Sequence, residues 1–472
     1  MTRLETVDTP AVQAAFDRTG PSVSGLCRLF WEIEEKYNLP AFRIAEVYVW
    51  PLVRMNLYYE LTQKIGLFGA AHPALKHSGK GKKSRGFSAG ALFQRELPLK
   101  AVVLRDRLGK RNRYAVVGNG RRIAGIEPYT EALLKEIGDQ SLLIEPQADD
   151  SAYENVWDYQ ELTRSFRSTK KKRKAISDPQ LSEMANALTA EFETRLGIEA
   201  PDIAEILSRA IWNFREEREG FGRLFKKNHT KKLFLLNAYS RPACIAAARD
   251  LDCSVVELQH GFISRYHLGY SWPGRPHIAY TPDELWCFGP AWCRSLDLPA
   301  GVTTRSIGAP YLEPFIEAAD TAKTLVVFTS QGVVGKRLLS IAIEVANRRP
   351  ALNIVFRLHP NEILESYRAE IEAREDIPSN FSLSHKDPSI FDLLSRARFQ
   401  IGSFSTTLIE GMAVGAFPIV LSMPGCEYME EVVQSGDARF ASSLEDVLAA
   451  LDSGAGNSAF RDYYAIPSDK LI

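Results

Sequence analysis

The chain has 472 residues, about three times the length of a typical domain, which predicts two or three domains. Its 58 basic and 58 acidic residues cancel to a formal charge of zero, which argues against a protein held on nucleic acid by its overall field. Apolar residues make up 45% of the chain, so its cores need neither disulfides nor metals to fold. The six cysteines include no CxxC pair, which disfavours zinc ribbons and disulfide frameworks and fits a reduced, cytoplasmic protein.

The N-terminal part is predicted to be a helical extension, residues 1–98, that ends in a basic loop. Its first 20 residues mix charged and polar side chains, so we expect no signal peptide. No stretch of the chain approaches the roughly 18 apolar residues that cross a bilayer. Helices are expected within residues 1–75, because Leu26, Phe30 and Ile33 recur on one helix face. Nothing in this part has catalytic spacing.

Residues 76–113 carry twelve Lys or Arg residues against two acids, Glu96 and Asp106. Glycines in the first part of this segment indicate an exposed loop. A solvated loop is one interpretation, and contact with an anionic membrane surface is the other, at roughly 1 kcal/mol per basic residue near such a surface. Aromatic residues are too sparse for base stacking, so no nucleic-acid partner is expected. The expected location is the cytoplasm, with peripheral contact to the inner membrane left open.

Short apolar strands then alternate with helices, which is the pattern of a parallel α/β sheet. The predicted strands are residues 101–104, 114–117, 141–144, 233–236 and 254–258. The predicted helices are residues 128–137, 181–224 with a break near 197–201, and 241–251.

The pattern restarts after a glycine- and proline-containing linker at residues 308–310, which we interpret as a hinge. The expected fold is therefore α/β, with two doubly wound Rossmann-like domains, residues 99–309 and 310–472, on either side of a cleft. Ligands bind such sheets at the carboxyl ends of their strands. In the second domain we predict strands at residues 324–328, 353–358, 399–401 and 418–421, and helices at residues 336–347, 390–395, 406–414 and 444–451.

Polar residues directly follow several of these strands. The sequence ELQHG, residues 257–261, closes one of them, and the unperturbed pKa of a histidine such as His260 suits general-base work near neutrality. The alternative is a structural histidine that bonds a loop carbonyl. The sequence RLHP, residues 357–360, closes another strand, and Arg357 and His359 offer donors to a phosphate. The alternative there is a turn whose polar groups satisfy one another.

A hydroxyl-rich turn, containing Ser403, Ser405 and Thr406, lies between a predicted strand and a predicted helix. Free N–H groups and the helix dipole favour an anion at such a turn, and simple helix capping is the alternative. Glu410 lies within the first turns of that helix, where its carboxylate could reach the two hydroxyls of a ribose.

Two glycine-containing turns lack the spacing of known phosphate-binding loops. The turn with Ser330 and Gln331 does not fit GxxxxGK[ST], so an NTPase is not expected, although a diphosphate or sugar contact stays open beside an ordinary loop. Residues 118–120 contain GxG without the full GxGxxG, so the case for a dinucleotide site is weak. No carboxylate or Cys/His cluster is present, so no metal is predicted.

Taken in order, residues 257–261, 357–360 and 403–411 resemble the motifs of bacterial GT-B glycosyltransferases of capsule and lipopolysaccharide assembly. The similarity extends over residues 233–451 and includes the Kdo and sialic acid transferases that use CMP-sugars and the teichoic-acid glycerophosphotransferases. The resemblance implies a metal-independent transfer of a sugar from a nucleotide donor, such as a CMP-linked sugar, to a glycan or glycolipid acceptor, with no other cofactor. Transfer of an alditol phosphate from a CDP-alditol, and a non-catalytic glycan-binding subunit, are the alternatives.

The resemblance also implies residue roles. It assigns the acceptor base to His260, with Glu257 as its orienter or rival. It places the ribose of the donor on Glu410. The phosphate contacts fall on His359, Ser405 and Thr406. The complete predicted donor site comprises His359, Arg357, Ser403, Ser405, Thr406, Glu410, Ser330 and Gln331.

Overall fold

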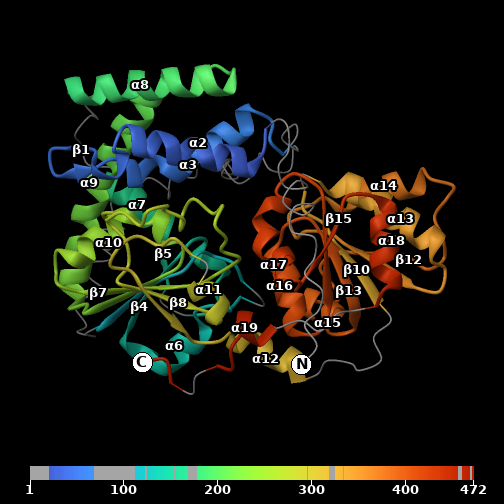
Figure 1. Ribbon diagram of the computed structural model, residues 1–472. Coiled ribbons are helices and arrows are strands. Elements are labelled where there is room, and N and C mark those ends of the chain that lie inside the picture. Colours follow the sequence, from blue (N-terminus) through green and yellow to red (C-terminus); the bar gives the residue numbers. More distant parts are fainter. Residues whose placement is uncertain are drawn as a thin grey trace, which may run out of the picture.

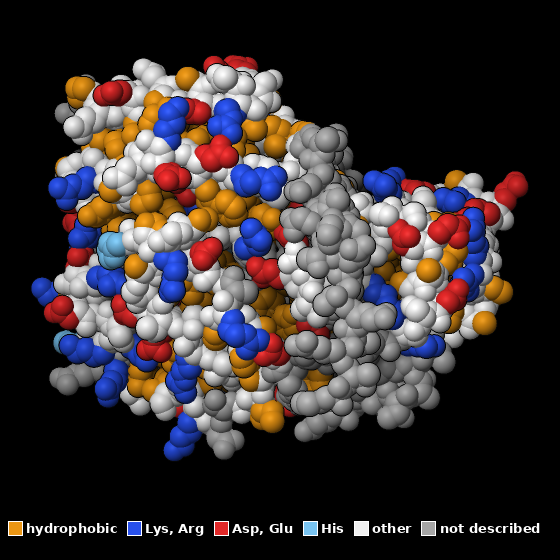
Figure 2. Space-filling model, in the orientation of Figure 1, with side chains coloured by type: hydrophobic (Ala, Val, Ile, Leu, Met, Phe, Trp, Pro, Cys, Tyr) orange, Lys and Arg blue, Asp and Glu red, His pale blue; other side chains and the backbone are white. Residues whose placement is uncertain are grey.

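The structure is a computed structural model that describes residues 21–68, 112–122, 125–153, 156–167, 178–294, 296–317, 325–332, 334–454, 460–467 and 470–472. Two α/β domains stand side by side in Figure 1, and a layer of helices covers one end of the first domain. On the face shown in Figure 2, acidic and basic side chains are interspersed over the described residues, as the formal charge of zero leads one to expect.

The first domain is built on a parallel sheet of seven strands. They are β3 (Tyr114–Val117), β4 (Ser141–Glu145), β5 (Trp157–Asp158), β6 (Lys232–Leu235), β7 (Ser254–Leu258), β8 (Glu284–Cys287) and β9 (Thr303–Ser306). The spatial order is β5-β4-β3-β6-β7-β8-β9. The chain therefore runs outward from β3 and returns to pair β6 with β3, which places a topological switch point between these strands, where α/β sheets bind ligands.

Helices cover both faces of this sheet, and one further helix packs on them and not on the sheet. They are α6 (Glu131–Ile137), α7 (Tyr159–Arg167), α8 (Pro179–Leu196), α9 (Ile203–Asn228), α10 (Pro242–Arg249) and α11 (Pro290–Arg294), with short 3-10 turns η4 (Gly138–Gln140), η5 (Ala148–Asp150) and η6 (Ala238–Ser240). The predicted break between α8 and α9 is confirmed. Gly197 ends α8 with φ +65°, and the Asp202 side chain caps α9 by accepting the Glu205 N–H at 3.0 Å.

The second domain repeats the plan with six parallel strands in the order β12-β11-β10-β13-β14-β15, so its switch point lies between β10 and β13. Its strands are β10 (Leu325–Thr329), β11 (Asn353–Arg357), β12 (Phe381–Ser384), β13 (Ala397–Gly402), β14 (Phe417–Leu421) and β15 (Arg439–Ala441). Its helices are η7 (Pro310–Leu312), α12 (Glu313–Glu317), α13 (Gly335–Arg348), α14 (Leu364–Glu372), α15 (Ile390–Ser395), α16 (Thr406–Ala413), η8 (Cys426–Met429), α17 (Glu430–Gln434), α18 (Leu444–Asp452) and α19 (Phe460–Tyr463). The predicted fold of two doubly wound Rossmann-like domains is confirmed.

The predicted N-terminal helices are present, but they are interrupted. α2 (Val23–Lys36) and α3 (Trp50–Lys64) are separated by the 3-10 turn η1 (Leu39–Ala41) and a small antiparallel pair, β1 (Arg43–Ile44) and β2 (Val47–Tyr48). Apolar side chains of α2 and α3 pack with those of α8 and α9 in one core. In Figure 1 these helices lie above the first sheet. In the described part of the chain, no helix is long and apolar enough to cross a membrane.

Some sequence predictions fall outside the described residues. These are the strand at 101–104, the helices expected before residue 21, and the basic segment 76–113 except for its last two residues. The limits drawn for the three domains also stay a prediction.

The last part of the chain returns to the first domain. The Trp292 indole donates to the Tyr463 carbonyl at 2.7 Å, and the Ala465 N–H donates to the Phe288 carbonyl at 2.9 Å. The same segment covers the predicted hinge, because a Cβ on Gly308 would lie 2.6 Å from the Cα of Pro467. The linker between the domains is therefore packed under the C-terminal segment.

Candidate functional site

The two domains touch where two of the sequence motifs meet. The Phe262 N–H, just after the ELQHG turn that follows β7, donates to Thr406 Oγ1 at the start of α16 at 3.1 Å. A Cβ on Gly261 would lie 3.3 Å from the same oxygen, so glycine permits this close approach. The fold thus joins residues that are 144 positions apart in the sequence, at the carboxyl ends of both sheets.

His260 lies at this domain interface, beside Tyr129 of the first domain. The two rings are edge to face with their centroids 6.5 Å apart. Its Nδ1 is buried and finds no hydrogen-bond partner among the described residues. Burial, together with the charges of His267 and Arg121, lowers the pKa of His260 to about 3. The imidazole is therefore neutral near pH 7, and it is a much weaker base than the unperturbed histidine from which a general base was predicted.

Glu410 projects from α16 toward the same interface and is fully buried. Its Oε1 accepts a hydrogen bond from the Tyr311 hydroxyl at 2.9 Å and lies 3.7 Å from Nη2 of Arg121. Its Oε2 is buried with no hydrogen-bond partner in the described chain. A buried carboxylate oxygen without a donor is costly, so this atom indicates a place where a ligand hydroxyl would be bound.

Arg121 was not among the residues predicted from the sequence. It follows β3, and its Nη1 donates to the Tyr129 hydroxyl while its guanidinium lies 5.4 Å from the centre of that ring. Its charge also contributes to lowering the pKa of both His260 and His359. The charge of the Arg121 side chain therefore acts on both predicted histidines. The available signal was the position of two arginines directly after a glycine turn at a strand end.

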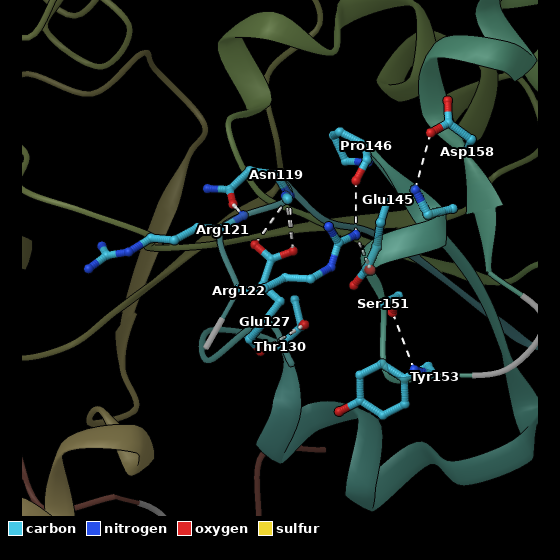
Figure 3. A network of polar contacts seen from close by, with 12 residues as sticks. Asn119, Arg121, Arg122, Glu127, Thr130, Glu145, Pro146, Ser151, Tyr153 and Asp158 are labelled. Carbon is cyan, nitrogen blue, oxygen red and sulfur yellow. Dashed lines mark hydrogen bonds and ion pairs between the residues drawn. The ribbon is translucent and has the colours of Figure 1, made fainter. Parts of the chain in front are cut away.

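The turn that carries Arg121 is held by a buried acid, Glu127, which was also not predicted from the sequence. Its carboxylate accepts the Asn119 N–H at 3.2 and 3.1 Å and the Gly120 N–H at 3.4 Å, as Figure 3 shows. A Cβ on Gly118 would lie 2.2 Å from Glu127 Oε2, which explains the first glycine of the GxG sequence. Burial raises the pKa of Glu127 to about 7, against the effect of these N–H donors.

The turn after β11 is closed by Glu362. The His359 N–H donates to Glu362 Oε2 at 2.6 Å, and Ser330 Oγ donates to Glu362 Oε1 at 2.9 Å. His359 Nδ1 accepts the Asn361 N–H at 3.2 Å. The structure thus brings together Ser330 and His359 from separate predicted motifs, through a carboxylate that was not predicted. Desolvation lowers the pKa of His359, which Glu362 opposes.

The hydroxyl residues before α16 have contacts within the protein. Ser405 caps the helix, with its hydroxyl accepting the Thr407 N–H at 3.3 Å. Ser403 Oγ donates to the Met423 carbonyl at 3.4 Å, and Gln331 Oε1 accepts a backbone N–H of the same turn at 3.4 Å. The capping role that the sequence left open is therefore present for Ser405.

Arg357 points away from the turn of His359. Its Nη1 donates to Ser384 Oγ at 2.8 Å and to the Pro388 carbonyl at 2.5 Å, and its Nη2 donates to the Lys386 carbonyl at 3.2 Å. These donors hold the loop after β12, which leaves the predicted phosphate contact of Arg357 without support in the geometry. Within the described ranges, no three His, Cys, Asp or Glu side chains are grouped as metal ligands.

Glu257 and His260 face different surroundings. Glu257 is buried, and its Oε1 accepts the Ala238 N–H at 2.9 Å and the Tyr270 hydroxyl at 2.6 Å. It lines a cavity of about 50 Å³ that lies against α3 and includes Arg54 among its walls. His260 lies instead at the domain interface, so the geometry favours it over Glu257 as the group that meets an acceptor.

The environment of Glu257 predicts a specific pH dependence of stability. Burial raises its pKa from 4.5 to about 7, although Tyr270 and Ala238 oppose the shift. The folded state then holds this proton more tightly than the unfolded state, so the carboxyl lowers stability as pH rises from 4.5 to about 7, by roughly 1.4 kcal/mol per pH unit. We expect Glu257→Gln to remove this decline when unfolding by urea is measured at several pH values.

Tyr270→Phe is the companion variant, because it removes a hydroxyl that favours the charged carboxylate. The decline should then extend to higher pH than in the wild type. If Glu257→Gln and the wild type show parallel pH profiles, Glu257 does not have the raised pKa assigned to it.

No protein-family model matches the chain, and no curated protein sequence matches it. Among solved structures, MurG of Acinetobacter baumannii is similar over 72% of this chain and 90% of that one, with 10% identity and a TM-score of 0.41. UDP-GlcNAc 2-epimerase of Neisseria meningitidis bound to UDP-GlcNAc is similar over 72% and 91%, with 11% identity and a TM-score of 0.43. Spinosyn rhamnosyltransferase SpnG, complexed with spinosyn aglycone, is similar over 72% and 90%, with 15% identity and a TM-score of 0.41. Likenesses this distant carry no argument about activity or substrate.

Proposed function

We propose that the chain is a glycosyltransferase that moves a sugar from a nucleotide donor to a glycan or glycolipid acceptor of the bacterial surface. One observation carries the proposal. Polar groups from both doubly wound domains meet at the carboxyl ends of the sheets, and two of them, His260 Nδ1 and Glu410 Oε2, are buried without a partner among the described residues. Doubly wound sheets bind ligands at this position. His260 Nδ1 can accept a proton there, and Glu410 Oε2 can accept a hydrogen bond from a ligand hydroxyl.

In the proposed complex the second domain holds the nucleotide. Glu410 Oε2 accepts the ribose hydroxyls, while the Tyr311 hydroxyl keeps Oε1 in place. The phosphate lies at the start of α16, where the helix dipole stabilises an anion, with Thr406 and His359 beside it. Charge on the departing phosphate is thereby stabilised by groups of the protein.

The first domain supplies the base. An acceptor hydroxyl attacks the anomeric carbon of the sugar and gives its proton to the neutral imidazole of His260. The bond between that carbon and the phosphate oxygen breaks, and its electron pair leaves with the nucleotide. Burial is the main cause of the low pKa of His260 and the charge of Arg121 is a smaller one, so a bound phosphate that offsets Arg121 makes this base stronger in part.

The motif resemblance supports a CMP-linked sugar, such as Kdo, as the donor and capsule polysaccharide or lipopolysaccharide as the product. It also supports action without a metal. The proposed place of work is the cytoplasm, with the acceptor presented at the inner membrane.

A panel of nucleotides tests the proposal by thermal unfolding. CMP, CDP, UMP, UDP and GDP would be compared, each with and without magnesium. A nucleotide present at about 100 times its Kd stabilises the folded state by about 2.7 kcal/mol. We expect CMP to stabilise the protein equally in the presence and absence of magnesium, and His359→Ala to remove the effect. His277→Ala, an exposed histidine of the first domain, is the matched control and should leave the response unchanged.

The other outcomes each have a meaning. A preference for UDP or GDP would contradict the CMP-linked donor and keep a nucleotide-dependent transferase. Product analysis with a CDP-alditol would reveal transfer of an alditol phosphate, in which a P–O bond breaks. No response to any nucleotide would contradict the transferase and favour a glycan-binding subunit, whose function would survive the loss of His260 and His359.

A further inference from the structure

Arg121 is placed as a ligand-binding cation by the turn that carries it. The Glu127 carboxylate fixes the backbone of Asn119 and Gly120, and the Asn119 side chain accepts the Arg121 N–H at 2.9 Å. Figure 3 shows the consequence, because the two adjacent arginines leave this turn in different directions. Arg122 turns inward to Glu145, at 2.8 Å, whereas the side chain of Arg121 extends away from the network.

The contacts of Arg121 leave it able to exchange partners. Its nearest acid is Glu410, at 3.7 Å, which is longer than a charge-assisted hydrogen bond. Its side chain is 40% exposed, whereas the carboxylate of Glu410 is 0% exposed. A phosphate with two charges could therefore reach the guanidinium from solvent, while Glu410 keeps its hydrogen bond from Tyr311.

Two cations of the second domain are engaged elsewhere. Arg357 donates to the loop after β12, and Lys336 pairs with Glu370 at 2.8 Å. In the described chain Arg121 is instead placed against Glu410 and within electrostatic reach of His359 and His260, which belong to opposite domains. A guanidinium also suits this role, since its planar fork matches two phosphate oxygens.

We propose that Arg121, on the glycine turn after β3 of the first domain, binds the phosphate of the donor and neutralises it as the nucleotide leaves. This inference rests on the proposed function, and it makes Arg121 a catalytic residue that acts from across the domain interface. The phosphate would lie between the guanidinium and the N-terminus of α16. Since these groups come from opposite domains, the leaving group is stabilised only when the domains are together.

The test compares ligands that differ only in phosphate. Binding of cytidine, CMP and CDP would be measured by calorimetry for the wild type, Arg121→Met and Arg121→Lys. We expect Arg121→Met to weaken binding of CMP and CDP by about ten- to a hundredfold and to leave binding of cytidine unchanged, because the only contact with the ligand that it removes is the charge-assisted one to the phosphate. Arg121→Lys should bind CMP and CDP with affinities between those of the wild type and Arg121→Met, since lysine keeps the charge but lacks the two-pronged guanidinium. Arg223→Met, on the exposed side of α9, is the control and should bind all three ligands normally.

The outcomes separate this inference from the function on which it rests. If the wild type binds CMP and Arg121→Met binds it equally well, the nucleotide site stands and the role of Arg121 is wrong. If Arg121→Met weakens binding of cytidine as much as binding of CMP, the residue only maintains the structure of the site, and the inference is also overturned. If the wild type binds neither these ligands nor their uridine and guanosine counterparts, the proposed function and the inference both fail.

Discussion

Arg54→Met is expected to lower the free energy of unfolding by about 3–5 kcal/mol, because it leaves the buried charge of Glu34 without its partner. Arg54 on α3 is 2% exposed, and its Nε and Nη2 contact the two oxygens of Glu34 on α2 at 2.5 and 2.8 Å. Its Nη1 donates to the Ser271 carbonyl at 2.9 Å, and its guanidinium lies 3.5 Å from the centre of the Trp272 ring. One side chain thus joins the N-terminal helices to a loop of the first domain.

Arg218→Met provides the matched control, since Arg218 makes an equally close two-pronged contact with Asp250 at 2.7 Å, but on the surface. Its loss should cost no more than about 1 kcal/mol. Replacing Glu34 together with Arg54 by apolar residues should recover much of the loss, because the cost arises from an unpaired buried charge. Urea unfolding of the four proteins measures these differences. Equal effects of Arg54→Met and Arg218→Met would contradict the burial assigned to this pair.

Most central strands could be predicted from the sequence, but the internal strand β8, which pairs with β7 and β9, was missed along with the edge strands. Tyr114–Val117 and Ser254–Leu258 were predicted with the bounds that the structure gives, because each is an apolar run with polar or glycine residues after it. The edge strands β5 and β9, by contrast, are short, and β9 reads TTRS. Strands of this kind owe their structure to a neighbour that supplies the hydrogen bonds, which no local pattern records.

The same division applies to the site. His260 and Glu410 could be selected as candidates because each follows a recognisable strand in a motif of its own. Arg121 and Tyr311 were missed, since their importance comes from contact with Glu410, and the sequence around each suggests only a turn or a linker. The sequence also could not show that Arg357, itself a predicted phosphate contact, points into the loop after β12. The direction of a side chain depends on the packed structure around it.

Glu410→Gln is expected to weaken binding of a ribonucleotide by about ten- to a hundredfold, the effect of losing a hydrogen bond to a charged group. The variant keeps the shape of the side chain and removes the charge that Oε2 would offer to the ribose. The hydroxyls of the sugar provide a direct test, because a 2′,3′-dideoxynucleotide lacks them. Glu410→Gln should bind the dideoxynucleotide as well as the wild type does, and calorimetry with both ligands measures the difference.

Two further variants make this prediction sharper. Tyr311→Phe removes only the hydroxyl that holds Glu410 Oε1 at 2.9 Å, so it should weaken the ribonucleotide less than Glu410→Gln and leave the dideoxynucleotide unchanged. Glu365→Gln, an exposed acid on α14, should alter neither affinity. Equal losses for both ligands in Glu410→Gln would mean that the carboxylate supports the fold of the site without touching the ribose. Tyr311 belongs to η7 in the linker between the domains. A loss of ribonucleotide affinity alone in Tyr311→Phe would therefore show that ribose binding depends on the position of the linker.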